Sequence, residues 1–350
     1  MRLRAEPLDL KLLHPFRISR GVQDYARALL VEITCGDLIG IGEAAPDGGG
    51  YYGEKRETML AALPYLAESL GDDPMLHEDI MQLLDKALHH GNGAAKAAID
   101  MALYDLAGKG LGIPLYQLLG LNPQRTPATS FTIAIDTPAA MAQRAQEAHE
   151  YPILKIKVGT PDDVEMIHAI RDVTDATIRV DANAAWTPKD ALNRIEAFAD
   201  FGIEFVEQPV AAFDLAGLRF VRERSPLPII ADESCVTLED VARVAECADG
   251  INIKLAKCGG ISNALKMIAA ARALHLKVML GCMISSSISI TAAAHLSPLV
   301  DYADLDGALL LAHDPYEGVR FDGGKMSLPD APGLGVRPRQ NAPEKSNPAS

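Results

Sequence analysis

The feature of this sequence that most constrains its fold is a repeat of roughly 25 residues that begins near Thr129. Short runs rich in β-branched and apolar residues alternate there with stretches long enough for a helix. The eight runs are 130–135, 153–158, 177–181, 204–207, 229–232, 251–254, 277–280 and 302–306. Strands that alternate with helices form a parallel sheet, and eight of them suit a closed (β/α) barrel. An open, doubly wound sheet is the alternative that the pattern allows.

The residues before this repeat follow a different pattern and predict a separate α+β domain. Residues 28–33 are typical of a strand, 48–53 of a glycine-rich loop and 94–108 of a helix. A chain of 350 residues is long enough for a barrel and a smaller domain. We therefore predict an N-terminal α+β capping domain, a barrel, a segment that returns to the capping domain and a disordered tail, at 1–125, 126–313, 314–337 and 338–350.

Charge and cysteine content exclude several classes of function. A formal net charge of −14 repels phosphate backbones, so we expect no nucleic-acid partner. The five cysteines are scattered and form no CxxC pair, which argues against a disulfide framework or a structural zinc site. The N-terminus lacks the apolar core of a signal peptide, and no apolar run is long enough for a membrane helix. We therefore expect a cytoplasmic protein with no membrane partner.

Charged side chains occur where nearly every apolar run of the repeat ends. In a barrel these ends meet at the face that carries the active site. Charges are costly to bury there unless they are paired or bind a metal. The pattern therefore favours a functional site over a chance placement at loop boundaries. The residues concerned are Lys155, Lys157, Asp181, Glu207, Asp232, Lys254, Asp304 and Asp306.

Asp181, Glu207 and Asp232 end three adjacent strands and predict a metal site. Three converging carboxylates repel one another, and a hard divalent cation removes that repulsion. Oxygen ligands favour Mg²⁺, or Mn²⁺. Such a cation would also stabilise the negative charge that develops on a substrate carboxylate when the neighbouring carbon loses a proton. Glu233 is expected to point away from this site by strand alternation and to support the ligands from behind.

Lys157 and Lys254 end strands that are four apart in a ring of eight, so we expect them to face each other across the barrel mouth. Two bases on opposite faces of one carbon are what a 1,1-proton transfer requires. Lys155 points to the same side as Lys157 and should make it a better base through its positive charge. Simple salt bridges are the alternative interpretation of this lysine pair. Lys257 is a second candidate base, but it lies past the strand, so we favour Lys254.

Together these residues resemble the enolase superfamily, in its muconate-lactonizing subgroup. The matching elements are the Lys155-x-Lys157 pair, Asp181-Ala-Asn, Glu207-Gln-Pro, Ala231-Asp-Glu-Ser, the segment 252–260 and the helix 97–106. The resemblance spans about residues 14–335 and implies an enolase-like, modified TIM barrel with a capping domain. The mandelate racemase subgroup has a histidine at the end of the seventh strand, where this chain has none. His295 lies downstream and is expected to be structural.

Within that subgroup, Asp304 and Asp306 resemble the Asp-x-Asp pair with which dipeptide epimerases bind the substrate ammonium group. The resemblance implies a magnesium-dependent isomerase that transfers a proton at the α-carbon of the C-terminal residue of a dipeptide. L-Ala-D/L-Glu or a related L-Ala-L-Xaa dipeptide is the expected substrate. Capping of a helix, or an ordinary loop position, is the alternative interpretation of the two aspartates.

The resemblance also implies that two loops of the capping domain, at 16–25 and 47–54, determine specificity. Arg20, in preference to Arg17, is expected to pair with a glutamate side chain of the substrate. Further substrate contacts are expected from Asn183 and Met283, and members of the superfamily often assemble as homo-oligomers.

Three other functions remain compatible with the sequence. Muconate-lactonizing cycloisomerases, and o-succinylbenzoate synthases with N-acylamino acid racemase activity, share the lysines and the metal triad but need no ammonium site. Asp304 and Asp306 therefore count against them. A non-catalytic barrel that binds small carboxylates would need the metal triad but not two opposed lysines.

Overall fold

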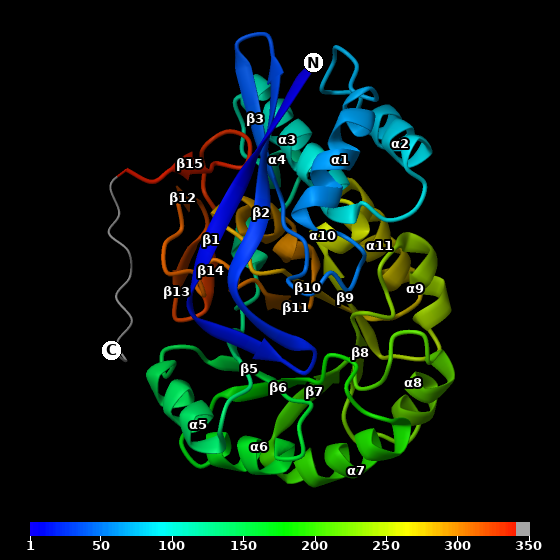
Figure 1. Ribbon diagram of the computed structural model, residues 1–350, viewed down its shortest axis with the longest axis vertical. Helices are drawn as coiled ribbons and strands as arrows, with labels where there is room; N and C mark the ends of the chain where they lie inside the picture. The colour runs from blue at the N-terminus through cyan, green and yellow to red at the C-terminus, as the bar shows by residue number, and fades with distance from the viewer. Residues whose placement is uncertain (341–350) are drawn as a thin grey trace.

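The computed structural model describes residues 1–340, and its centre is a sheet of eight parallel strands (Figure 1). The strands are β4 (Phe131–Ile133), β5 (Ile153–Lys157), β6 (Thr177–Asp181), β7 (Ile203–Glu207), β8 (Ile229–Ala231), β9 (Gly250–Lys254), β10 (Lys277–Gly281) and β11 (Tyr302–Asp304). They pair in sequence order from β4 to β11. A parallel bridge between Thr129 and Ala303 brings the two edges together, so the barrel is nearly closed. The prediction of a barrel is confirmed, and the open-sheet alternative is wrong.

Helices follow each of the first seven strands and form the outer layer of the barrel (Figure 1). They are α5 (Pro138–Glu147), α6 (Asp163–Arg171), α7 (Pro188–Phe198), α8 (Leu215–Arg222), α9 (Leu238–Val244), α10 (Leu255–Cys258), α11 (Ile261–Ala273) and α12 (Ser287–Leu296). Three of these helices begin at a capping side chain. Thr137, Thr187 and Asp214 each accept a hydrogen bond from a backbone N–H of the first turn. Up to residue 340, no helix follows β11.

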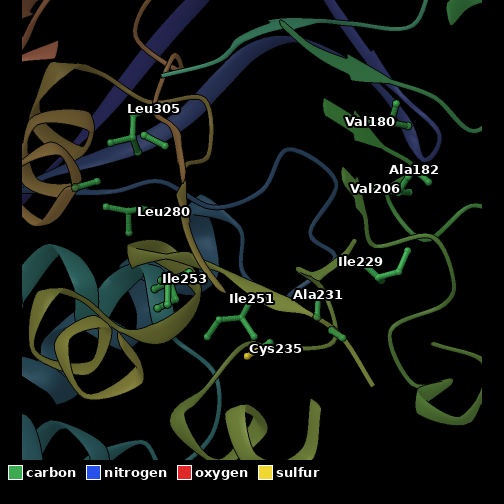
Figure 2. Packing of buried hydrophobic residues seen from close by; sticks show 14 of the residues in the cluster. Val180, Ala182, Val206, Ile229, Ala231, Cys235, Ile251, Ile253, Leu280 and Leu305 are labelled. Carbon is green, nitrogen blue, oxygen red and sulfur yellow. The ribbon is translucent and has the colours of Figure 1, made fainter. Parts of the chain in front are cut away.

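The strands carry apolar side chains on one face and polar ones on the other, because successive residues alternate. The outward residues, such as Val180, Val206 and Ile253, are fully buried against the helices (Figure 2). Inside the barrel, Phe205 and Ile230 belong to a small apolar cluster. The charged side chains lie further along the same strands, at their carboxyl ends. The alternation thus allows one strand to build the core and the site.

The capping domain combines an antiparallel sheet with four helices. Its strands are β1 (Arg2–Ile18), β2 (Gly21–Cys35) and β3 (Leu38–Ala44), and its helices are α1 (Arg56–Ala67), α2 (His77–Ala87), α3 (Gly93–Leu111) and α4 (Leu115–Leu118). Helix α3 is almost entirely buried. Gly42 permits this close packing, because a Cβ there would collide with the carbonyl oxygen of Ala98. The predicted front strand and helix are confirmed.

The residues after β11 form two short antiparallel pairs, and the segment at Gly333 and Leu334 lies against α3 and α4. Strands β12 (Tyr316–Glu317) and β15 (Arg337–Pro338) form one pair, and β13 (Arg320–Asp322) and β14 (Lys325–Ser327) form the other. The predicted tail therefore begins too early, because Pro338 is already paired in a strand. Residues 341–350 of that tail lie outside the described residues. Within the described part of the chain, no helix is long and apolar enough to cross a membrane.

Glu43 links the capping domain to the barrel, and its burial gives a testable pH dependence. Its carboxylate, on β3, accepts hydrogen bonds from the backbone N–H groups of Ser286 and Ser289 and from the Ser286 hydroxyl, at the start of α12. Burial raises the pKa of Glu43 from 4.5 to about 7, although these hydrogen bonds oppose the shift. The native state therefore holds this proton more tightly than the unfolded chain does.

We expect Glu43 to make the free energy of unfolding fall by about 3 kcal/mol as the pH rises from 4.5 to 7. The contribution is fully present below pH 4.5 and is lost as the pH passes the folded-state pKa. Glu43→Gln should remove this component, which urea unfolding at pH 5 and pH 8 would measure. The exposed Glu68→Gln should behave like the wild type. An unchanged pH dependence in Glu43→Gln would contradict the assignment.

Candidate active site

Five consecutive strands, β5 to β9, bring charged side chains to one end of the barrel. Lys157 pairs in register with Asp181, and Asp181 pairs with Glu207. Asp232 follows β8 directly, and Lys254 ends β9. Lys157 Nζ lies 2.6 Å from Asp181 Oδ2, and Lys254 Nζ lies 2.8 Å from Asp232 Oδ2. The three carboxylates are thus placed side by side, with one lysine at each end of the row.

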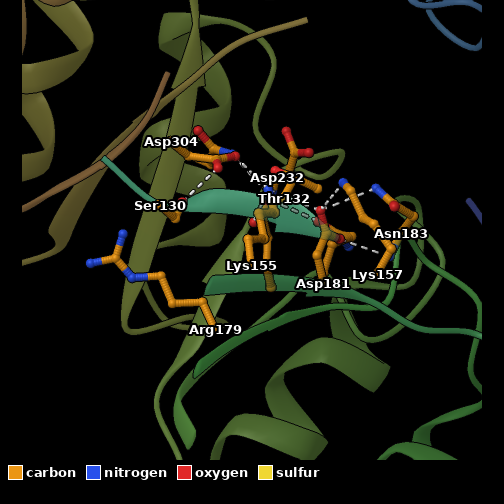
Figure 3. A network of polar contacts seen from close by, with 12 residues as sticks. Ser130, Thr132, Lys155, Lys157, Arg179, Asp181, Asn183, Asp232 and Asp304 are labelled. Atoms are coloured by element: carbon orange, nitrogen blue, oxygen red, sulfur yellow. Dashed lines mark hydrogen bonds and ion pairs between the residues drawn. The ribbon is translucent and has the colours of Figure 1, made fainter. Parts of the chain in front are cut away.

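Lys155 lies at the centre of this polar network (Figure 3). Its Nζ is 2.7 Å from Glu207 Oε2, 2.7 Å from Asp304 Oδ2 and 3.1 Å from Asp181 Oδ2. Burial alone would lower the pKa of Lys155, but the three carboxylates outweigh it and hold the pKa well above its usual value. Lys155 is therefore a permanent ammonium group that neutralises buried acids.

The carboxylates have the chemistry of a site for a hard cation, although lysines now occupy the space among them. Within residues 1–340, no three His, Cys, Asp or Glu side chains lie close enough to surround one ion. Glu207 Oε2 pairs with Lys155 Nζ at 2.7 Å, but no other donor contacts it within residues 1–340. Burial and the charge of Asp181 raise the pKa of Glu207 to about 7. Negative charge is therefore only partly compensated, and an oxygen-only donor set fits Mg²⁺ or Mn²⁺.

Lys254 and Lys257 both contact Asp232, but they differ in access. Lys254 lines the cavity described below, and Lys257 does not. Burial would lower the pKa of Lys254, but the charge of Asp232 outweighs it and the pKa is raised. Lys254 is therefore an ammonium group while it is paired with Asp232. Of the two lysines, Lys254 is therefore the one that a molecule in the cavity could reach.

Asp304 and Asp306 line the cavity and differ in charge compensation. Asp304 accepts hydrogen bonds from Lys155 and from the Ser130 hydroxyl, and its pKa is lowered because the charge of Lys155 outweighs burial. Asp306 Oδ2 accepts a hydrogen bond from the backbone N–H of Thr132. Burial and the charge of Asp304 raise the pKa of Asp306 to about 7. Neither aspartate caps a helix. Asp306 is therefore a cavity carboxylate without a lysine partner among the described residues.

Arg20 lies in the turn of the β1–β2 hairpin. The predicted loop at 16–25 is wrong for most of its length, because β1 continues to Ile18 and β2 starts at Gly21. Its Nη1 donates to Glu233 Oε1 and to the carbonyl oxygen of Asn183, both at 2.7 Å. Its guanidinium stacks 4.3 Å from the ring centre of Tyr51 in the glycine-rich loop. Arg20 thus connects the hairpin, the loop and the barrel mouth. Arg17 is not among the residues that line the cavity.

The predicted direction of Glu233 is wrong. Strand β8 ends at Ala231, so strand alternation no longer determines where residue 233 points. The Glu233 side chain lines the cavity and pairs with Arg20, and its Oε2 has no hydrogen-bond partner. Burial and the charge of Asp232 raise the pKa of Glu233.

A cavity of about 490 Å³ lies between the barrel mouth and the capping domain. The predicted site residues on its wall are Lys155, Lys157, Asn183, Lys254, Met283, Asp304, Asp306 and Arg20. The three carboxylates at 181, 207 and 232 are fully buried, and three of the lysines that contact them, Lys155, Lys157 and Lys254, line the cavity instead. Residues of both predicted specificity segments, including Ile18 and Tyr52, complete the wall. The cavity is large enough for a small peptide.

Two polar residues of the site were missed from the sequence. Asn252 Nδ2 donates to Glu207 Oε1 at 2.7 Å. Gln208 Oε1 accepts hydrogen bonds from the backbone N–H groups of Asp232 and Ser234. Asn252 could have been found, because it precedes Lys254 by two residues and so faces the same side of β9. Gln208 belongs to the Glu207-Gln-Pro element, but strand alternation gives no direction for its side chain, because its left-handed backbone (φ 36°) places it outside the strand pattern.

His295 has the structural role that the sequence predicted. It is fully buried, its Nδ1 accepts a hydrogen bond from the backbone N–H of Tyr116, and its Nε2 lies 3.1 Å from the carbonyl oxygen of Leu334. Burial lowers the pKa of His295 to about 4, so the ring is neutral at pH 7.

The fold and site define a member of the mandelate racemase/muconate lactonizing enzyme family, and the chain belongs to it. Residues 6–120 match the N-terminal domain of that family, and residues 138–342 match the enolase C-terminal domain-like model. The chain is 43% identical to an L-Ala-D/L-Glu epimerase of Bacteroides thetaiotaomicron, over 96% of this chain and 88% of the relative.

Solved structures of dipeptide epimerases have the same fold. The enzyme of Enterococcus faecalis, complexed with Mg and L-Leu-L-Tyr, superimposes with a TM-score of 0.91 at 39% identity, over 96% of this chain and 98% of that one. The enzyme of Cytophaga hutchinsonii, complexed with Mg and D-Ala-L-Val, superimposes with a TM-score of 0.92 at 32% identity, over 97% and 96% of the two chains.

Proposed function

We propose that this protein is a magnesium-dependent dipeptide epimerase that inverts the α-carbon of the C-terminal residue. The observation that carries the proposal is the row Lys157, Asp181, Glu207, Asp232, Lys254 on consecutive strands, because it puts one lysine at each end of a carboxylate cluster. A substrate Cα–H held between the lysines can lose its proton to one of them. The other, as an ammonium group, can return a proton to the opposite face.

The carboxylates of Asp181, Glu207 and Asp232 would hold the cation. When bound, Mg²⁺ would compete with the lysines for these carboxylates and would stabilise negative charge on the oxygens of the substrate carboxylate. Lys155 keeps Glu207 and Asp181 close together by pairing with both. The capping domain supplies the part of the cavity wall that faces the barrel mouth.

The two ends of the cavity suggest which substrate fits. Asp306, whose negative charge is not balanced by a lysine, suits the N-terminal ammonium group of a dipeptide. Arg20 uses Nη1 for Glu233 and Asn183, and its Nε and Nη2 donate no hydrogen bond within residues 1–340. These groups can bind the carboxylate of an acidic C-terminal side chain. We therefore propose L-Ala-D/L-Glu, or a closely related L-Ala dipeptide, as the substrate.

Incubation of the protein with L-Ala-L-Glu and Mg²⁺ in D₂O tests this function directly. We expect deuterium at the glutamate α-carbon, which ¹H NMR would detect. We also expect L-Ala-D-Glu to appear, which chiral chromatography would detect. N-acetyl-L-Ala-L-Glu, which lacks the ammonium group, should react far more slowly. Exchange of N-acylamino acids in preference to dipeptides would instead support the N-acylamino acid racemase alternative.

Asp306→Asn should raise KM for L-Ala-L-Glu by about 10–100-fold, because a charge-assisted hydrogen bond contributes about 1.5–3 kcal/mol. The change should be small for the N-acetylated dipeptide, which makes no such contact. Initial rates at varied concentrations of both dipeptides measure the difference. Asp301→Asn is the matched control, since Asp301 lies just before β11 and pairs with Arg272. A normal KM in Asp306→Asn would mean that the ammonium group binds elsewhere.

A further inference from the structure

Lys257 is a buried lysine that the proposed proton transfer does not use. It lies in α10, and its side chain is 1% exposed. Its Nζ contacts four oxygens: Asp232 Oδ1 at 2.5 Å, the Asp232 carbonyl at 2.7 Å, the Asn252 carbonyl at 2.9 Å and the Cys235 carbonyl at 3.0 Å. An ammonium group has three N–H donors, so these acceptors use all of them. Lys257 therefore has no donor left for a substrate.

The position of Asp232 explains why such a contact is needed. The parallel pairing between β8 and β9 ends at Ala231, so Asp232 lies beyond the ladder that fixes the preceding residues. Its backbone N–H is held by Gln208, and its carboxylate is held by two lysines. Lys257 pairs with Asp232 Oδ1, and Lys254 pairs with Asp232 Oδ2. One oxygen of Asp232 is thereby bound to a lysine that does not line the cavity, and the other is bound to a lysine that does.

We propose that Lys257 is a positioning residue for the cation site. It fixes the rotation of the Asp232 carboxylate by holding Oδ1, so that Oδ2 is the oxygen left for the cation, and it joins the end of β8 to β9 through three backbone carbonyls. The inference rests on the proposed function, since it assumes that Asp232 binds the cation. The inference gives different roles to the two lysines that pair with Asp232. Lys254 transfers protons, and Lys257 orients Asp232 as a ligand of the cation.

Binding of Mn²⁺ to the full chain without substrate, followed by electron paramagnetic resonance, tests this role independently of activity. We expect Lys257→Met to raise the Kd for Mn²⁺ by about 10–100-fold, as loss of groups that orient metal ligands does. The direction of the change in Kd distinguishes positioning from a simple charge effect. Removal of a positive charge beside a cation would by itself tighten binding, so weaker binding identifies the loss of positioning.

Three further variants sharpen the test. Lys257→Gln retains two N–H donors and should have a Kd between those of the wild type and Lys257→Met. Lys254→Met should bind Mn²⁺ at least as tightly as the wild type, because it frees Asp232 Oδ2. Lys96→Met removes a lysine that is equally buried and pairs with Asp85, and should leave the Kd unchanged. At saturating Mn²⁺, kcat of Lys257→Met should stay within tenfold of the wild type.

The outcomes distinguish this inference from the proposed function. If the wild type binds Mn²⁺ and Lys257→Met binds it equally well, the positioning role is wrong and the epimerase proposal stands. If the wild type binds no Mn²⁺, both fail. Circular dichroism reports folding of each variant. If Lys257→Met and Lys257→Gln both fail to fold, the lysine serves the fold as a whole and the positioning role is overturned.

Discussion

Lys254→Met is expected to lower kcat for dipeptide epimerisation by about 10²–10⁴-fold, the usual contribution of a general acid or base. Lys157 remains in this variant, so it should still exchange the α-proton of the one epimer that presents that proton to it. The physical reason is that the two lysines approach the α-carbon from different sides of the cavity. Exchange in D₂O, measured separately for L-Ala-L-Glu and L-Ala-D-Glu, reports each half-reaction.

Lys157→Met should show the mirror pattern and exchange only the other epimer. Lys266→Met is the control, because Lys266 is partly exposed and pairs with Glu78 on the surface. If either single variant epimerised both dipeptides within tenfold of the wild-type rate, the two-base arrangement could not be the mechanism.

Glu207→Gln and Asp232→Asn should both abolish Mg²⁺-dependent activity, by about 10³-fold or more, because each removes a charged cation ligand. Their effects on stability should differ. Glu207 is a buried acid with a raised pKa, and its partner Lys155 keeps Asp181 and Asp304. The metal-free Glu207→Gln protein should therefore unfold at the same urea concentration at pH 8 as the wild type, or at a higher one.

Asp232→Asn should instead be destabilised by about 3–5 kcal/mol, because it leaves two buried ammonium groups without their shared carboxylate. Urea unfolding in EDTA measures stability, and isothermal titration with Mg²⁺ measures binding. Asp249→Asn, which removes a partly exposed carboxylate that pairs with Arg222, is the control. Normal Mg²⁺ affinity in both site variants would place the cation elsewhere.

The sequence predicted the barrel and the residues at its mouth because both depend on strand alternation. A run such as 177–181 is apolar at alternate positions and ends in an acid, and a parallel barrel must bring such ends together. The same rule predicted that Lys157, Asp181, Glu207 and Lys254 lie at one end of the barrel, and in the structure they do. Their roles in binding and catalysis remain predictions.

The rule fails where strands end. Glu233 lies two residues past β8 and therefore points into the cavity, against the prediction. Lys155 was expected mainly to act on Lys157, but in the structure it pairs with three carboxylates from three different strands. Such a contact depends on the curvature of the barrel, which no local pattern specifies. The Arg20 contacts with Glu233 and Asn183 join residues more than 160 positions apart, so they could not be predicted from local sequence either.

The return of the chain to α3 after β11 has a consequence for biosynthesis. Asp105 in α3 receives a hydrogen bond from the backbone N–H of Leu334, and the N–H of Leu115 donates to the carbonyl of Gly333. These partners are translated more than 200 residues later. The longest helix of the capping domain is therefore fully covered only after residues 333 and 334 have been synthesised, and a nascent chain stalled before residue 333 would expose that surface to chaperones.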